Sequence, residues 1–453
     1  MALLSNNALE HLLIYFGVMY YGATICTIHV EMNAVIIKEI LKSLDPKLVL
    51  FEEGLGLEEE ISRSDYPARA LGSWSQQNCT GFVAEISGLS AENPAPVYCP
   101  DDIATIFFTS GTTAEPKGIL CSFRHLETNV AAVLEAFGIR AQDRLLDYRS
   151  FNWASAQMLS ALGALCQGAT LIMPRKFSGS RFFEWIKTYK PTVVAGNPTV
   201  FNMLLAKNSR HAASHLSSIR FMTSSSAALS VADWKRFEEQ YGVPIVQGYG
   251  TSEAGWIGAA SLEDRRMGSV GRPLAYHKLE IVSDGGAALP ICEIGHIEVG
   301  AEPSREFGYL TGDGSIKVTH VGRFRTGDMG YLDEDGFLFI TGRSKDLIIR
   351  GGVNISPMEI DLVINQLPGV SEAASVGVPD KIYGEEVVAF VAIADGASLD
   401  AETIRLHCQD QLVELKTPKS IYIVDVLPRT ERGKLDRKEL KNLWLEMGNK
   451  KGS

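Results

Sequence analysis

No C-x-x-C pair occurs in this sequence, and cysteine is scarce. The seven cysteines are odd in number and scattered, at Cys26, Cys79, Cys99, Cys121, Cys166, Cys292 and Cys408. This pattern provides no zinc or disulfide framework, and it suits a reducing compartment. We therefore expect a cytoplasmic protein.

An excess of positive charge is also missing. The chain has 43 basic and 54 acidic residues, which gives a formal net charge of −11. Such a balance argues against broad binding to nucleic acids or to anionic membranes. The composition leaves the oligomeric state open.

The stretch at residues 12–30 lacks charged residues and has two interpretations. It is long enough to suggest a membrane span. However, Gly17 and Gly22 divide it, tyrosines and threonines dilute its apolarity, and no basic residues precede it. We favour a buried helix, a turn at Gly22 and a strand over residues 23–30, and we expect no integral membrane span.

Neither an internal repeat nor a low-complexity tract is present, and 453 residues exceed one ordinary core. Apolar runs that predict strands alternate with helical patterns between residues 155 and 247, which favours an α/β fold of helix-covered parallel sheets. From Leu279 onward strands and Gly/Asp turns prevail, as in a small β-barrel. Beyond Gly342, a tail of about 110 residues mixes strands and helices and has the size of a small α+β domain.

A Walker A loop is absent, because Lys117 lies between Pro116 and Gly118. Residues 109–118 nevertheless follow an apolar, strand-like run and combine four hydroxyls, two glycines and a lysine. Glycine admits backbone N–H groups to an anion, hydroxyls donate hydrogen bonds and lysine adds a point charge. The segment is either a phosphate-binding loop or a Ser/Thr-rich surface turn.

A second motif, residues 248–253 (GYGTSE), follows a predicted strand. Ligands of open α/β sheets bind at this end of a strand. There Tyr249 can stack on a base, Thr251 can contact a phosphate and Glu253 can hold Mg²⁺ through oxygen. The alternative is a Gly-rich turn with a solvated glutamate.

Four further motifs are weaker when each is taken alone. Asp328, in residues 325–328, is either a structural turn residue or an acid for ribose hydroxyls. Residues 342–346 form either a hairpin turn or a joint. Residues 351–357 permit close backbone approach, and residues 428–434 form a basic turn in which Lys434 is most simply a solvated surface lysine.

In this order and at these separations, the motifs resemble the adenylate-forming superfamily of acyl-CoA synthetases, nonribosomal adenylation domains and firefly luciferases. The resemblance covers residues 101–434 and is strongest to a free-standing acyl-CoA ligase. It implies a large AMP-binding domain over residues 1–342, a hinge over 343–346 and a small mobile C-terminal domain over 347–453. It also implies an AMP-forming acid–thiol ligase that uses ATP, Mg²⁺ and CoA.

For the large domain, the resemblance implies nucleotide and metal roles. Tyr249 matches the residue that stacks on adenine, and Gly250 and Ser226 belong to the same nucleotide site. Thr251 matches a phosphate contact and Glu253 the Mg²⁺-binding carboxylate, both counted as catalytic. The loop that closes over the β- and γ-phosphates corresponds to Thr109, Ser110, Gly111, Thr112, Thr113 and Lys117.

For the tail, the resemblance implies ribose contacts from Asp328 and Arg343 and a hinge at Lys345. Lys434 matches the catalytic lysine that contacts the substrate carboxylate and the α-phosphate. A carboxylate attacks ATP poorly because two anions must meet, and a lysine, Mg²⁺ and loop N–H groups offset that repulsion.

The second half-reaction is attack of a thiolate on the acyl-adenylate. In the family the tail domain rotates between the two steps, so that the lysine leaves and a glycine loop arrives. Gly351 and Gly352 match that loop, which shapes the pantetheine tunnel.

The sequence departs from the family pattern in three places. Ala114 replaces a glycine of the phosphate loop, which hinders closure if that residue needs a positive φ. Residues 224–229 replace a more glycine-rich run, which we interpret as tolerated. The chain also begins inside the family pattern, so we expect an N-terminus that is truncated, either because the start is misassigned or because this is a shortened form with an exposed sheet edge and an incomplete core.

The acyl pocket is expected to be lined from Tyr148, Phe151, Asn152, Trp153, Met158, Ser224 and Trp256. This set favours a medium- or long-chain fatty acid or an aromatic acid, as in fatty acid metabolism, although helix packing explains Phe151 and Met158 equally well. Arg149 either meets a second carboxylate or, as we prefer, makes a surface pair.

Few residues follow Lys434, so no carrier domain is expected and CoA is the simplest acceptor. The alternatives are a stand-alone adenylation protein that loads a separate carrier, and a truncated, inactive homologue that binds nucleotide.

Overall fold

The computed structural model describes residues 1–62, 66–74, 78–90, 95, 97–109, 117–206, 216–301, 306–394, 396–430 and 435–450. The chain folds into two compact units. The first comprises Met1–Leu229, Asp233–Leu279 and Val299–Phe324, and the second comprises Ser230–Ala232, Glu280–Glu298 and Arg325–Ser453. This architecture confirms the predicted α/β fold class, with a large sheet-containing N-terminal part and a separate C-terminal part.

The first unit contains an eight-stranded sheet in the order β17-β16-β6-β5-β2-β1-β3-β4. Its first strand, β1, is buried and pairs in parallel with both β2 and β3, so β1 lies inside the sheet and not at its edge. The strands are β1 (Ala2–Leu4), β2 (Ile25–Thr27), β3 (Val49–Phe51), β4 (Ala68–Ala70), β5 (Ile103–Thr109), β6 (Lys117–Ser122), β16 (Glu306–Leu310) and β17 (Ile316–Val321).

A second sheet of the same unit has seven strands in the order β13-β12-β11-β10-β9-β7-β8. Its central strands are parallel, as the strand–helix alternation predicts. The strands are β7 (Arg144–Leu146), β8 (Thr170–Ile172), β9 (Val193–Gly196), β10 (Phe221–Ser224), β11 (Ile245–Thr251), β12 (Gly255–Ala259) and β13 (Arg272–Pro273).

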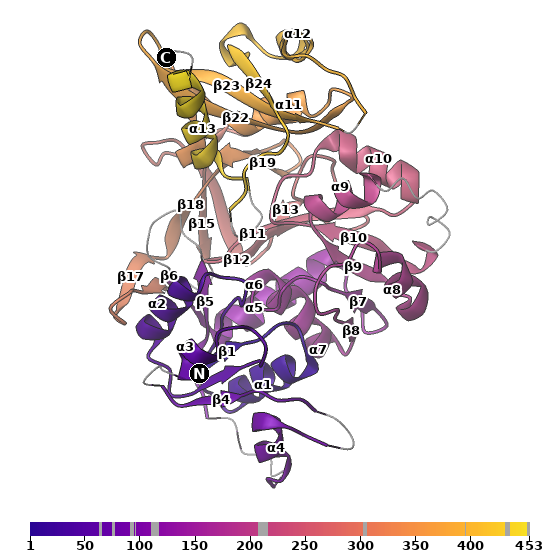
Figure 1. The fold of residues 1–453 in the computed structure, drawn as a ribbon, viewed down its shortest axis with the longest axis vertical. Helices are drawn as coiled ribbons and strands as arrows, with labels where there is room; N and C mark the ends of the chain where they lie inside the picture. The colour runs from indigo at the N-terminus through magenta and orange to yellow at the C-terminus, as the bar shows by residue number, and fades with distance from the viewer. Residues whose placement is uncertain are drawn as a thin grey trace. The chain divides into compact units, whose positions relative to one another are not determined.

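Helices cover these sheets, and Figure 1 shows α5 and α6 beside β12, which both helices contact. Apolar residues of α5, such as Val133 and Phe137, share one core with Phe107 of the first sheet and Phe221 of the second. The helices are α1 (Leu9–Tyr20), α2 (Ala34–Leu44), α3 (Glu58–Ser62), α4 (Gly81–Ser87), α5 (Phe123–Phe137), α6 (Ala154–Ala156), α7 (Gly163–Gln167), α8 (Phe182–Tyr189), α9 (Pro198–Ala206) and α10 (Val231–Tyr241).

Local signals explain several helix boundaries. The Asn33 side chain accepts a hydrogen bond from the Val35 amide at the start of α2, and Asp45 ends the helix in a left-handed conformation. The apolar stretch at 12–30 becomes α1, a turn in which Gly22 has φ +85°, and β2. None of the helices in the described ranges is long and apolar enough to cross a membrane.

The first of the helical patterns expected between residues 155 and 247 contains an unexpected element. Residues Gln157–Leu162 form a π-helix between α6 and α7. A π-turn inserts an extra residue into the helix, and such insertions often occur at functional sites. All six residues are buried. Their sequence pattern does not distinguish a π-turn from an ordinary helix.

Strands dominate the second unit, as expected beyond Leu279. A four-stranded sheet, β14-β15-β18-β19, contributes most of its residues to this unit. Its strands are β14 (His277–Val282), β15 (Gly295–Ala301), β18 (Arg323–Leu332) and β19 (Leu338–Arg343).

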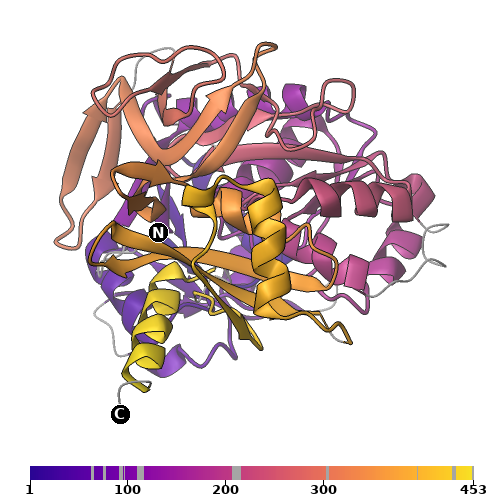
Figure 2. The same cartoon turned by 90° about the horizontal axis from the view of Figure 1, so that it is seen from above.

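The tail forms a separate five-stranded sheet of β20 (Ile348–Arg350), β21 (Val353–Ile355), β22 (Val370–Asp380), β23 (Gly384–Ile393) and β24 (Ser420–Val424). Figure 2 shows its orange strands beside the gold and yellow helices. Helices α11 (Pro357–Ile364) and α12 (Ala401–Gln411) pack on one face, and α13 (Arg437–Lys450) packs on the other. Alternating residues such as Ala373 and Ala374 face these two cores, so the tail has a core of its own.

Candidate active site

The predicted phosphate loop connects two antiparallel strands, β5 and β6, that pair up to Thr109 and Lys117. It therefore leaves a buried strand, as predicted, but it belongs to a hairpin, which the sequence did not indicate. Gly118 has no room for a side chain, because an added Cβ would lie 2.9 Å from Phe108 and 3.1 Å from Leu310 on β16. Ser110, Gly111, Thr112 and Thr113 lie outside the described residues.

Tyr309 on β16 contacts both Lys117 and Glu253. The Lys117 Nζ lies 5.7 Å from the centroid of the Tyr309 ring, a cation–π distance. On the other side, the Tyr309 hydroxyl donates to Glu253 Oε1 at 3.4 Å. A single tyrosine therefore links the base of the phosphate loop to the predicted Mg²⁺ carboxylate.

The electrostatics of this contact favour the neutral phenol. Partial burial and the negative charge of Glu253 raise the pKa of Tyr309 to about 12. The hydroxyl is therefore a hydrogen-bond donor at neutral pH. Sequence reasoning missed Tyr309, because only the pairing of β16 with β6, far away in the chain, shows its position.

The GYGTSE motif forms the end of β11 and its turn into β12. Ala254 donates its amide hydrogen to Thr251 Oγ1 at 3.1 Å, so this hydroxyl also stabilises the turn. Gly250 pairs with Trp256, and a Cβ on Gly250 would lie 2.3 Å from the Gly255 carbonyl oxygen. The structural and functional interpretations of this Gly-rich turn are therefore compatible.

Residues 224–226 follow β10, the strand beside β11. Ser224 and Ser225 are buried, and neither hydroxyl has a hydrogen-bond partner among the described residues. Ser226 is exposed and has φ +74°, a backbone conformation that favours glycine. The glycine-poor run is therefore accommodated, but with backbone strain at Ser226.

We predict that Ser226→Gly stabilises the first unit by about 0.5–1 kcal/mol, because relief of left-handed strain exceeds the entropy that glycine adds to the unfolded chain. The urea midpoint of unfolding measures this change. Ser225→Gly is the matched control, because residue 225 is not among the residues with positive φ, and it should lower the midpoint. A lower midpoint for Ser226→Gly would contradict the prediction.

The structure divides the predicted acyl-pocket residues between two faces of the seven-stranded sheet. Met158 and Trp256 belong to the core between the sheets, where the Trp256 ring packs edge-on against Phe137 at 5.4 Å. Tyr148 packs instead into the opposite core, beside Phe177 and Phe182. Tyr148 is therefore not placed with the other apolar members of the set.

Phe151, Asn152 and Trp153 precede α6 and are held by the N-terminal segment. Phe151 donates its amide hydrogen to Asn7 Oδ1 at 2.9 Å, and Asn152 Nδ2 donates to the Ser5 carbonyl at 3.0 Å. The Trp153 ring stacks on His29 at 5.6 Å. Within the described part of the chain, Asn152 Oδ1 and Trp153 Nε1 have no hydrogen-bond partner.

The expectation that Arg149 makes a surface pair is wrong. Its side chain is 1% exposed and forms a buried ion pair with Asp147 at 2.7 Å. Asp147 also accepts a hydrogen bond from Ser160 Oγ at 2.5 Å. Because Asp147 neutralises the guanidinium, Arg149 is a structural residue of the loop before α6.

In the second unit the structure brings together the two predicted ribose residues. Asp328 and Arg343 are directly paired across β18 and β19, and Arg343 Nε lies 3.2 Å from Asp328 Oδ1. Asp328 is 7% exposed, and its amide donates to Thr326 Oγ1 at 3.1 Å. Arg343 thus orients the carboxylate, and the Thr326 hydroxyl fixes the backbone beside it.

The interval after β19 is not a hairpin turn. Lys345 is exposed in a single 3₁₀ turn, Ser344–Asp346, and this turn joins β19 of the four-stranded sheet to β20 of the five-stranded sheet. The hairpin interpretation of residues 342–346 is therefore wrong, and the joint stays a prediction.

Of the remaining tail motifs, the structure describes residues 351–357 but not Lys434. Gly351 (φ +59°) and Gly352 (φ +83°) form the exposed turn between β20 and β21. Pro357 begins α11. Lys434 lies outside the described residues.

Comparisons with known proteins define the class of this fold and site. Residues 1–305 match the AMP-binding enzyme family, and residues 359–434 match the AMP-binding enzyme C-terminal domain. The chain belongs to the AMP-binding enzyme family, and it is an acid–thiol ligase of the AMP-forming acyl-CoA synthetase class.

Among its relatives, the chain is 36% identical to sulfoacetate–CoA ligase of Cupriavidus necator, over 78% of this chain and 69% of that protein. It is 30% identical to oxalate–CoA ligase of Arabidopsis thaliana, over 98% and 88% of the two chains. The crystal structure of ATP-bound MatB from Rhodopseudomonas palustris superposes with a TM-score of 0.86 at 25% identity, covering 98% of this chain and 88% of that one.

Proposed function

We propose that this protein activates a carboxylic acid with ATP as an acyl-adenylate, releases pyrophosphate, and transfers the acyl group to CoA with release of AMP. The observation that carries the proposal is the link from Lys117 through Tyr309 to Glu253 at the base of a hydroxyl-rich loop. The ATP-bound structural neighbour and the CoA ligase relatives support the same activity.

In the first unit we assign the loop from Thr109 to Lys117 to the β- and γ-phosphates and Tyr249 to the adenine. Glu253 would hold Mg²⁺, because a half-buried carboxylate is a suitable oxygen ligand for an ion that phosphates and water also bind. The described residues contain no group of three His, Cys, Asp or Glu side chains for a metal, so one carboxylate fits Mg²⁺ better than an all-protein metal site. When bound, Mg²⁺ neutralises charge on the phosphates.

In the second unit we assign Asp328 and Arg343 to the ribose hydroxyls, with the carboxylate as acceptor. Lys434 would neutralise the substrate carboxylate and the α-phosphate during the first step. Gly351 and Gly352 would contact the pantetheine arm of CoA in the second step, and the connection at Lys345 would be the hinge. The domain limits at 342 and 347 belong to this proposal.

For the substrate we propose an apolar acid, fatty or aromatic, because Met158 and Trp256 are buried among apolar side chains. A second candidate is a small polar acid. The unpartnered Asn152 Oδ1 and Trp153 Nε1 favour it, because an apolar acyl chain would leave these atoms unpaired. Relatives named for sulfoacetate, oxalate and indoleacetate include acids of both kinds.

A panel of carboxylic acids tests the proposal. Acid-dependent pyrophosphate release without CoA is expected for at least one acid, followed by thioester and AMP formation when CoA is added. Transfer to a carrier protein but not to CoA would favour the carrier-loading alternative. No pyrophosphate with any acid would contradict the proposed function. We also propose a cytoplasmic location, consistent with seven free cysteines, all of them in described positions.

We predict that Tyr309→Phe weakens MgATP binding about three- to tenfold, because one hydrogen bond to the charged Glu253 is lost while the ring beside Lys117 remains. Tyr309→Leu removes both contacts and should weaken binding further. Isothermal titration with MgATP measures the effect, and the KM for CoA serves as the internal control. Unchanged Kd values for both variants would show that Tyr309 has no part in nucleotide binding.

A further inference from the structure

Two hairpins of the five-stranded sheet meet at their tips. The β20–β21 hairpin turns at Gly351 and Gly352, and the β22–β23 hairpin turns between Asp380 and Gly384. The Gly351 amide donates to the Tyr383 carbonyl at 2.8 Å, and Arg350 is directly paired with Gly384. The glycine turn is therefore fixed to the neighbouring hairpin by its backbone.

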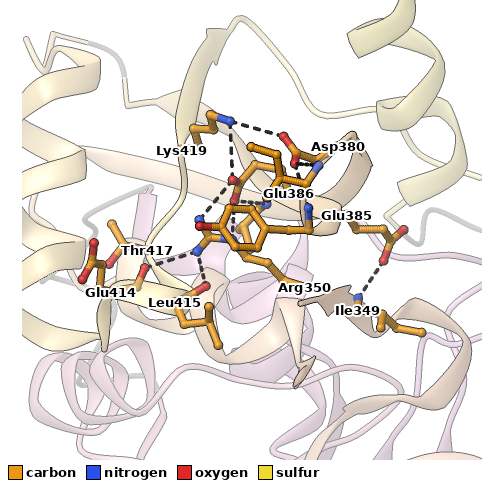
Figure 3. A network of polar contacts seen from close by, with 12 residues as sticks. Ile349, Arg350, Asp380, Glu385, Glu386, Glu414, Leu415, Thr417 and Lys419 are labelled. Carbon is orange, nitrogen blue, oxygen red and sulfur yellow. Dashed lines mark hydrogen bonds and ion pairs between the residues drawn. The ribbon is translucent and has the colours of Figure 1, made fainter. Parts of the chain in front are cut away.

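Arg350 lies at the centre of this junction, as Figure 3 shows. Its Nη1 donates to the Leu415 carbonyl at 2.6 Å, and its Nη2 donates to Glu386 Oε2 at 3.0 Å. Arg350 Nε lies 2.7 Å from Glu386 Oε1, and the guanidinium carbon lies 5.0 Å from the Tyr383 ring centroid. The side chains of Arg350 and Glu386 are 13% and 4% exposed, so the pair is almost fully buried.

Further charged side chains hold the backbone of both tips (Figure 3). Lys419 Nζ lies 3.6 Å from Glu386 Oε2 and 3.4 Å from Asp380 Oδ2. Asp380 Oδ1 accepts hydrogen bonds from the amides of Ile382, at 2.8 Å, and Tyr383, at 3.0 Å. Glu385 Oε2 accepts the Ile349 amide at 2.7 Å. We call Arg350, Asp380, Glu385, Glu386 and Lys419 the tip network.

Apolar side chains beside the tip network face solvent. Ile349 is 54% exposed, Val353 42%, Ile382 83% and Tyr383 43%. All four lie within three residues of the glycine turn or in the neighbouring hairpin turn. Clustered exposed apolar side chains often mark a binding surface. A buried ion pair often stabilises a fold no more than an apolar pair would, so stability alone does not explain the Arg350–Glu386 pair. These two observations indicate that the tip network orients the hairpin tips.

We propose that Arg350 and Glu386 are positioning residues for the thioester-forming half-reaction, which hold the Gly351–Gly352 turn and its apolar flanks against the pantetheine arm of CoA. The inference rests on the proposed function. In that step the CoA sulfur forms a bond to the acyl carbonyl carbon, the bond from that carbon to the AMP oxygen breaks, AMP leaves with the electron pair and the thiol proton goes to solvent. Neither residue takes part in that bond exchange.

Arg350→Met tests the proposal, because it keeps the length of the side chain and removes the guanidinium. Acid-dependent pyrophosphate release without CoA should stay within about twofold of wild type, because the first step does not use the turn. Transfer from supplied acyl-adenylate to CoA should fall about tenfold or more, in line with loss of charge-assisted hydrogen bonds. Amide hydrogen exchange at Gly351 should become faster.

Glu386→Gln is the second variant and keeps the shape of the residue in case Arg350→Met does not fold. The matched control is Arg405→Met, which breaks an exposed ion pair with Glu402 on α12 and should change neither half-reaction. Equal loss in both half-reactions, or unchanged transfer, in a folded variant would overturn the proposal.

The hydrogen-exchange measurement separates this inference from the proposed function. If wild type releases no pyrophosphate with any acid, the proposed function fails, and with it the role of the network in thioester formation. Unchanged exchange at Gly351 in both variants, in a wild type that is active, would overturn the tip network alone.

Discussion

Replacing Lys434 with alanine is expected to slow acyl-adenylate formation by about 10²–10³-fold while leaving transfer from supplied acyl-adenylate to CoA nearly intact. The first step brings a carboxylate to a polyphosphate and needs a cation between the two anions. The second step starts from an adenylate in which the acid is already esterified, so that repulsion is absent. Pyrophosphate release and thioester formation, measured separately, give the two rates.

Lys438→Ala is the control for Lys434, because Lys438 is an exposed lysine at the start of α13. It should leave both half-reactions at wild-type rates. If Lys434→Ala slowed both half-reactions equally, the lysine would not be specific to adenylation. Such a result would remove the central assignment in the tail.

Glu253→Gln is expected to weaken the apparent affinity for Mg²⁺ in adenylation by about 10–100-fold. The amide keeps the size of the side chain and can still accept the Tyr309 hydroxyl, so the change isolates the loss of negative charge. A hard divalent cation prefers carboxylate oxygen to amide oxygen. Magnesium titrations of pyrophosphate release, at saturating ATP, measure the shift.

Glu263→Gln serves as the control, because Glu263 is an exposed carboxylate of the same unit. Its magnesium midpoint should match wild type. An unchanged midpoint for Glu253→Gln would show that this carboxylate does not hold the ion. The phosphate loop and water would then have to supply all of its ligands.

The sequence predicted the local elements well where their signals were local. The stretch at 12–30 was expected to form a helix, a turn at Gly22 and a strand, and the structure has α1, a turn in which Gly22 has φ +85°, and β2 there. The alternation from 155 to 247 predicted parallel strands under helices, and β9, β10 and β11 pair in that way. Periodicity and caps depend on neighbouring residues, so one sequence is sufficient to detect them.

The features that the sequence missed depend on pairing between distant segments. Tyr309 approaches Glu253 only because β16 pairs with β6, and its own neighbours do not indicate this contact. Arg149 reads as a surface residue from its polarity, yet Asp147, two positions earlier, permits its burial as an ion pair. The left-handed conformation of Ser226 was also missed, because its residue type does not favour it.

The second unit illustrates the same distinction. The residue types around Asp328 and Arg343 predicted a ribose site, and the strand register places these two side chains opposite each other. In contrast, Arg350 gave no signal in the sequence, because its partners at 386 and 415 come from later elements of the tail. Charged residues that become buried through such contacts are the hardest to assign from sequence.

Oxygen-isotope transfer is the most direct test of an acyl-adenylate intermediate. A carboxylic acid labelled with ¹⁸O in its carboxylate, incubated with the protein, ATP, Mg²⁺ and CoA, should yield AMP that carries one labelled oxygen, because that oxygen attacks the α-phosphorus. Label found in orthophosphate together with ADP would mean that ATP is cleaved at its terminal phosphate, and it would contradict the account.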